Sequence, residues 1–168
     1  MIIDDFSTND FISSLGTRWR GVSDQVMGGV SVASISMDHI QGQSCLRLQG
    51  DVRLENNGGF IQASLDLSDP GGVFDASDYR GLRLTVRGNE QLYSVHLRTS
   101  DTVRSWQSYR AQFRATEAWE ICDLPFSAFT PHRLTENLDT HRLRRIGLVA
   151  IGRAFTADLA VSRIEYYQ

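Results

Sequence analysis

Four histidines and two cysteines are the side chains in this sequence best suited to nucleophilic or metal chemistry. A catalytic triad requires a histidine beside a serine or cysteine, held by a carboxylate, and a zinc site requires closely spaced histidines or cysteines. Neither arrangement is visible, because the histidines fall in separate segments, at His39, His96, His132 and His141. We therefore expect no catalytic residue, no metal site and no cofactor.

One pair of carboxylates leaves an enzymatic alternative open. Asp24 and Glu55 are distant in the chain, but folding could bring them together, and two facing carboxylates are the machinery of glycoside hydrolysis. Lysine-dependent chemistry is excluded, since all 17 basic residues are arginine. There can be no Schiff-base lysine, no lysine general base and no phosphate-loop lysine.

Length and composition predict a single globular domain over residues 1–168. The chain is 41% hydrophobic and 22% charged, which is ordinary for a protein with one buried core. No apolar run approaches the roughly 20 residues needed to cross a bilayer, and residues 1–6 resemble neither a secretory signal nor a transit peptide. We expect a cytoplasmic location, and free thiols rather than a disulfide at Cys45 and Cys122.

The net charge of −3 conceals a contrast between regions. Residues 1–79 hold 4 arginines and 11 acidic residues, whereas residues 80–114 hold 7 arginines and 2 acidic residues. The remaining residues, 115–168, are nearly balanced, with 6 arginines and 7 acidic residues. An arginine-rich middle segment in an acidic protein indicates a local cationic surface, because the field of the whole chain is too weak to attract polyanions.

Alternating apolar and polar residues, the pattern of half-buried β-strands, recur along the chain. They occupy 46–54, 82–86, 93–97, 109–113, 119–121 and 157–161, and a continuous apolar run fills 146–151. The last alternating pattern changes phase before Ile164, as a β-bulge requires. Helical signals are confined to short turns within 7–15 and 124–129. Many short strands without a long helix predict an all-β sandwich or jelly roll.

The phase of three strands predicts an arginine-rich surface. We expect 82–86 and 93–97 to form a hairpin, with 109–113 in the same sheet. If the apolar residues point inward, their polar neighbours point outward together. These neighbours include Arg83, Arg87, His96, Arg98, Arg110 and Arg114. Such a face would suit an anionic or polar ligand or an acidic protein surface, although a solvated face of arginines paired to acids fits the same pattern.

Two glycine pairs, Gly28-Gly29 and Gly58-Gly59, mark loops that need unusual backbone conformations or close approach. Polar side chains flank both pairs: Asp24, Ser31, Asn56 and Asn57. These side chains could simply staple tight turns. Alternatively, the two loops meet at one rim and form a polar pocket, since β-sandwiches carry their sites on loops. The floor of that pocket would be Trp19, Met27 and Phe60.

Two segments are more specific than a general β-sandwich pattern. Residues 19–31 read Trp-Arg-Gly-Val-Ser-Asp-Gln-Val-Met-Gly-Gly-Val-Ser, and residues 50–60 read Gly-Asp-Val-Arg-Leu-Glu-Asn-Asn-Gly-Gly-Phe. They closely resemble the complex I intermediate-associated protein 30 family, with its Ser-Asp-x-Val-Met-Gly-Gly-x-Ser and Gly-x-Val-x-Leu-Glu-Asn-Asn-Gly-Gly-Phe motifs. The similarity continues in order through further segments: 78–82, 86–93, 119–129 and 146–148.

The resemblance implies a galactose-binding-domain-like β-sandwich and a role in assembly. The mitochondrial member of the family binds assembly intermediates of respiratory complex I, and a plastid relative is linked to photosystem II messenger RNA. The implied partner is a protein client, such as a subunit or intermediate of a membrane electron-transfer complex. We expect it to be bound by the loop residues and arginines named above.

Two other kinds of ligand remain open. A small-ligand module would bind a carbohydrate or an anionic metabolite, and Trp106 is the best candidate to stack on a sugar ring. RNA binding would draw on the arginine surface. The sequence pI of 5.8 and the shortage of aromatic residues among those arginines argue against RNA.

Overall fold

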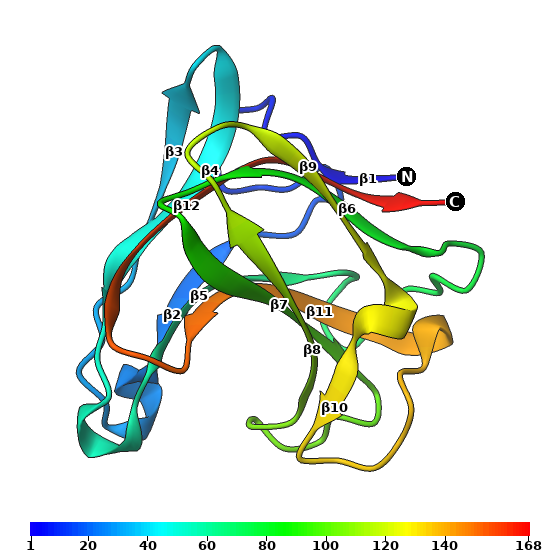
Figure 1. Cartoon of the computed structure of the whole chain (residues 1–168). Coiled ribbons are helices and arrows are strands. Elements are labelled where there is room, and N and C mark those ends of the chain that lie inside the picture. The colour runs from blue at the N-terminus through cyan, green and yellow to red at the C-terminus, as the bar shows by residue number, and fades with distance from the viewer.

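The computed structural model describes residues 1–168 and shows two antiparallel β-sheets packed face to face (Figure 1). The prediction of an all-β sandwich is confirmed. Helical structure is limited to four short 3-10 turns, and no helix has the length and hydrophobicity to cross a membrane.

We name each sheet after a central strand. The β12 sheet has the order β3 (Ser34–Ile40), β4 (Gln43–Val52), β12 (Phe155–Tyr167), β6 (Gly81–Arg87) and β9 (Glu120–Pro125), with β1 (Ile2–Asp4) also paired to β12. The β11 sheet has the order β10 (Thr130–His132), β8 (Ser108–Ala115), β7 (Gln91–Thr99), β11 (Leu143–Ile151), β5 (Phe60–Asp66) and β2 (Arg20–Ser23).

The four 3-10 turns are η1 (Asp24–Met27), η2 (Glu55–Asn57), η3 (Phe126–Ala128) and η4 (Thr140–Arg142). The turn predicted within 124–129 is therefore confirmed as η3. The helical turn predicted within 7–15 is wrong, because that segment forms non-helical turns and an isolated bridge. Its polar side chains hydrogen-bond locally instead, as Asp10 does with the amide of Ile12.

The predicted alternation places apolar side chains between the two sheets. Leu46 and Leu48 of β4, and Val95 and Leu97 of β7, are almost fully buried. They belong to one hydrophobic cluster of 32 buried residues, whose burial supplies the main driving force for folding. The register of β12 shifts after Val161, so the predicted bulge is also confirmed.

The predicted hairpin of 82–86 with 93–97 is wrong. Strand β6 pairs with β9 and β12 in one sheet, whereas β7 pairs with β8 and β11 in the other. The connection at Gly88 crosses from sheet to sheet. Alternation reports which side chains face the core, and in a sandwich the strands of both sheets satisfy the same pattern. The sequence therefore did not reveal that these two neighbours lie in opposite layers.

Both cysteines are free, and they lie on different strands of the β12 sheet. Burial raises the pKa of Cys45 to about 11. Its thiol stays protonated at neutral pH, and a protonated thiol is a poor nucleophile.

Candidate functional site

The outer face of the β11 sheet is hollowed into a groove of about 850 Å³ that is lined by residues of all six strands. The η1 and η2 loops project beside each other at one end, at the lower left of Figure 1, and the loops before β8 and after β10 project at the other. The lining contains no aspartate or glutamate. Its basic side chains are Arg20, His96, Arg98, Arg110, His132, Arg133 and Arg145.

The two glycine loops meet at one rim of this groove. The side-chain amide of Asn56 donates a hydrogen bond to the carbonyl of Gly28 across the gap between them, at 3.1 Å. Met27 is 55% exposed, and both Met27 and Asn57 line the groove. The loops are therefore neighbours in space, as one of the two interpretations of the sequence required.

A single buried carboxylate, that of Asp24, joins the two loops. Its Oδ1 accepts from the Ser31 amide at 2.9 Å, and its Oδ2 accepts from the Gly59 amide at 2.6 Å. The Ser31 hydroxyl and the Phe60 amide also donate to it. Burial alone would raise the pKa of Asp24, but these hydrogen bonds outweigh burial and lower it. Asp24 is therefore ionised at neutral pH and acts as a staple.

The closeness of this carboxylate explains a glycine in each pair. A Cβ on Gly29 would lie 2.4 Å from Cγ of Asp24, and a Cβ on Gly58 would lie 2.5 Å from its Oδ2. Real Cβ atoms essentially never approach other atoms closer than 3.0 Å. Both glycine pairs thus supply backbone that can close around one carboxylate, in agreement with the interpretation that these loops are stapled as tight turns.

Three of the predicted loop residues are inaccessible to a ligand. Asp24 and Ser31 are both 0% exposed and hold the loops together. Trp19 is 1% exposed, and its indole Nε1 donates to Oδ2 of Asp4 at 2.8 Å within the core. The prediction that Trp19 floors the pocket is therefore wrong, because the floor is the outer face of the sheet.

The enzymatic alternative loses its carboxylate pair. Asp24 has no exposed surface, and its oxygens are occupied by backbone and hydroxyl donors. Glu55 is exposed and pairs with Arg53 instead. No group of three or more histidine, cysteine or acidic side chains is close enough to hold a metal ion.

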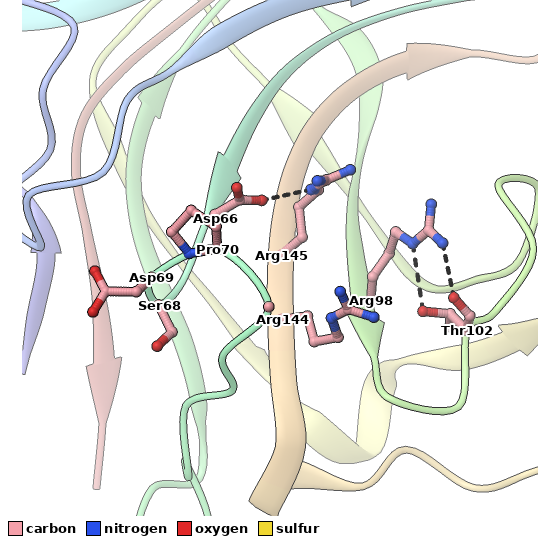
Figure 2. A pocket seen from close by; sticks show the side chains of 9 residues that line it. Asp66, Ser68, Asp69, Pro70, Arg98, Thr102, Arg144 and Arg145 are labelled. Carbon is pink, nitrogen blue, oxygen red and sulfur yellow. Dashed lines mark hydrogen bonds and ion pairs between the residues drawn. The ribbon is translucent and has the colours of Figure 1, made fainter.

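Two of the predicted arginines lie in the groove and have no carboxylate partner. Arg98 donates to the carbonyls of Thr102 at 2.8 Å and Arg104 at 3.2 Å, and Figure 2 shows it turned toward Thr102. Arg110 donates through Nε to the hydroxyl of Ser108 at 2.9 Å. Burial lowers the pKa of both arginines, and neighbouring arginines lower it further. Both nevertheless stay protonated at neutral pH, because the unperturbed pKa of arginine exceeds 12.

Two further arginines of the groove share one acid. Arg145 pairs with Asp66 at 2.8 Å, as Figure 2 shows, and Arg20 approaches the other oxygen of Asp66 at 3.6 Å. This pairing lies where the groove adjoins a smaller pocket of about 240 Å³, which Arg98 and Arg144 also line. One carboxylate cannot balance two guanidinium groups, so this end of the groove also keeps a positive charge.

Two histidines lie among these arginines. His96 is opposite Gly147 on one side and Arg110 on the other in the sheet register. Its Nε2 is buried without a hydrogen-bond partner. Burial, with the charges of Arg110 and His132, lowers the pKa of His96 to about 3, so the ring is neutral at pH 7. Burial also lowers the pKa of His132, with contributions from Arg110 and Arg133.

The remaining predicted arginines lie outside the groove. Arg83 and Arg87 belong to β6 and therefore to the opposite sheet, where Arg83 pairs with Asp123 at 2.6 Å. Arg114 is on β8 but donates to the Glu90 carbonyl at 2.8 Å and does not line the groove. The prediction that all the arginines share one face is thus wrong, because it depended on the hairpin that does not form.

The structure also brings into the groove two arginines that the sequence pattern did not indicate. Arg145 precedes the apolar run of β11, and Arg20 follows Trp19 in the first motif. A strand phase extended by one residue would have placed Arg145 outward. Only the order of strands, in which β11 lies between β7 and β5, could have shown that it faces the same groove as Arg98.

Comparison with solved structures supports the fold. The family 11 carbohydrate-binding module of the cellulosomal cellulase Lic26A-Cel5E of Clostridium thermocellum matches with a TM-score of 0.75 at 14% identity, over 99% of this chain and 93% of that one. A family 11 module from the same organism, in complex with a β-1,3-1,4-mixed-linked tetrasaccharide, matches at 0.72 and 14% identity, over 99% and 94%. A family 30 carbohydrate-binding module matches at 0.60 and 14% identity, over 82% and 75%. At these identities the likeness shows a shared fold.

Sequence comparison specifies the family. No curated protein sequence gives a significant match. The family model for complex I intermediate-associated protein 30 (CIA30) matches residues 5–161, a span that includes both glycine loops and every strand of the groove. The predicted resemblance is confirmed, and this chain belongs to the complex I intermediate-associated protein 30 family.

Proposed function

We propose that this chain is a non-catalytic binding protein that holds a protein client in the groove of the β11 sheet. Its role would be that of an assembly or stability factor for a membrane electron-transfer complex. Membership of a family named for association with complex I intermediates supports this class of role.

The observation that carries the proposal is the composition of the groove. Arg98 and Arg110 have no carboxylate partner there, and the same groove exposes Val26 and Met27 at its other end. Arginine and methionine are enriched in protein interfaces, where apolar contact and charged hydrogen bonds act together. A face of this kind suits a client segment that has both apolar and acidic residues.

Affinity purification from native cells, followed by mass spectrometry, tests the proposal. The wild-type protein should recover a defined subunit of a membrane complex, and Arg98→Glu or Arg110→Glu should lose it. Arg87→Glu is the matched control, because it makes the same charge change on the opposite sheet. Recovery of nothing above background, or equal loss with the control, would contradict the proposal. Circular dichroism would confirm that each variant is folded.

A carbohydrate ligand is the second candidate, favoured by Trp106. This side chain is 54% exposed and lines the groove, and a flat exposed aromatic ring can stack on a sugar. Calorimetric titration with mixed-linkage β-glucan oligosaccharides should then give saturable binding that Trp106→Ala removes. Absence of binding across a glycan array would dismiss this candidate. RNA, the third candidate, requires binding that weakens steeply with salt.

A further inference from the structure

The end of the groove at β7, β8 and β10 collects four basic side chains that have no acidic partner. We name Arg110, Arg133, His96 and His132 the cationic cluster. Strand pairing brings it together, since His96 is opposite Arg110, and Ser108 is opposite His132. None of the four forms an ion pair. The loop that carries Trp106 closes this end, because Gln107 donates to the Arg133 carbonyl at 3.1 Å.

Positive charge on one member of the cluster makes protonation of its neighbours less favourable. Burial is the largest cause of the lowered pKa of His96, and Arg110 and His132 add to it. Burial is also the largest cause of the lowered pKa of Arg110 and of His132; Arg133 adds to the first shift, and both arginines add to the second. Each of these shifts means that a further positive charge is unfavourable there. A bound anion would reverse this balance.

The cluster also has hydrogen-bond donors to spare. Arg110 uses one donor, on Ser108, and the Arg133 side chain makes no hydrogen bond. A guanidinium has five N–H donors, and an ionised carboxylate is purely an acceptor, so the two are complementary. A neutral sugar hydroxyl also donates, and it would find no carboxylate in this lining to accept from it.

On the basis of the proposed function, we propose that the cationic cluster is the subsite for a side-chain carboxylate of an acidic client segment. The other end of the groove favours a peptide over an acidic glycan. Apolar side chains line that end, from Val22 and Val26 to Met27 and Ile151. They match apolar residues of a peptide, which an acidic glycan lacks.

Fluorescence anisotropy with two labelled ten-residue peptides tests the subsite. One peptide has leucines in one half and glutamates in the other, and the second has glutamine in place of each glutamate. The glutamate peptide should bind at least tenfold more tightly. Arg110→Gln and Arg133→Gln should each weaken it about tenfold, the loss expected for one charged hydrogen bond. Arg87→Gln on the opposite sheet should leave its affinity unchanged.

Histidine resonances provide a second readout that a change in folding would not imitate. A carboxylate between Arg110 and Arg133 should raise the pKa of His132 from its lowered value, as followed by NMR titration. The glutamine peptide should leave this pKa unchanged. Arg133 is exposed, so its glutamine variant should keep the melting temperature of the wild type.

Several outcomes would overturn the subsite. They are equal affinity for the two peptides, no measurable binding of the glutamate peptide, or tighter binding of an oligogalacturonate that depends on the same arginines. A double variant, Arg110→Gln with Arg133→Gln, that still captures the native client would reject the subsite and leave the proposed function standing. Failure of the wild-type protein to capture any client would reject the proposed function itself.

Discussion

The two outer faces of the sandwich hold several of their arginines in different ways. On the β12 sheet, Arg47 pairs with Asp38 at 3.0 Å and with Asp158 at 2.7 Å. Arg83 and Arg163 on that sheet also pair with acids. On the β11 sheet, Arg98 and Arg110 are held by carbonyl and hydroxyl oxygens, which orient the guanidinium without cancelling its charge.

This difference teaches that an arginine-rich surface is not by itself a binding site. Residues 80–114 contribute arginines to both faces, and the acids beside them distinguish the two. Exposed ion pairs are worth only about 0–1 kcal/mol, so pairing on the β12 sheet does little for stability but removes a local field. The absence of a carboxylate partner at Arg98 and Arg110 is the informative feature of the β11 sheet, where Asp66 pairs with Arg145 and Arg20 instead.

The largest effect is expected from a substitution of Asp24, which joins the two glycine loops at the rim of the groove. Asp24→Asn places an amide NH₂ among backbone N–H donors in a buried position, so donors would face donors. We expect a loss of about 3 kcal/mol or more in the free energy of unfolding, measured by urea denaturation. Asp69→Asn, at an exposed position, is the control and should change stability little. Equal, small effects of both variants would show that Asp24 is not a staple.

His96, which is neutral in the folded protein, should make the free energy of unfolding depend on pH. The pKa of His96 is about 3 in the folded protein, below its unperturbed value of 6.5, so the unfolded chain takes up a proton first as the pH falls. Stability is therefore lost below pH 6.5, by about 2 kcal/mol from this group between pH 7 and pH 5. His96→Asn should lack this component in urea denaturation at the two pH values. Identical pH dependence in variant and wild type would contradict the prediction.

Supplying the missing acid should make the β11 face resemble the β12 face. His132→Asp places a carboxylate beside Arg110 and Arg133 without burying new apolar surface. We expect affinity for the glutamate peptide to fall about tenfold or more, while stability holds or rises. Thr85→Asp is the matched control, since Thr85 lies between the arginines of β6. Undiminished binding by His132→Asp would contradict the contrast between the two faces.

The smallest effect is expected on the β12 sheet. Asp123→Ala removes the partner of Arg83, where both side chains are about two-fifths exposed, at 39% and 42%. Stability should fall by less than about 1 kcal/mol in urea denaturation. The freed arginine should not bind the glutamate peptide, because the groove lies on the other sheet. New peptide binding by this variant would show that an unpaired arginine is sufficient.

Much of the fold could be predicted from the sequence, because core-facing alternation is written into each strand. Leu46, Leu48, Val95 and Leu97 are buried as their spacing indicates, and the bulge in β12 follows from its change of phase. Strand pairing is different, because it is fixed by contacts between distant segments. The assignment of Arg83 to the arginine surface failed for that reason.

The candidate site was predicted only in part, again for physical reasons. His96, Arg98 and Arg110 lie together because β7 and β8 are a true antiparallel pair. Trp19 was misplaced because an aromatic residue next to a loop motif can face either the core or a pocket. Arg145 was missed because β11 reaches the middle of the sheet from a segment far along the chain.

The Asp24 staple has a consequence for the kinetics of binding. One carboxylate receives hydrogen bonds from both glycine loops, so neither loop can swing away without breaking the bonds of the other. The two glycine loops at the rim of the groove should move as one body and lose little conformational entropy when a ligand binds. Ligands of different affinity should therefore associate at similar rates and differ mainly in how long they stay bound.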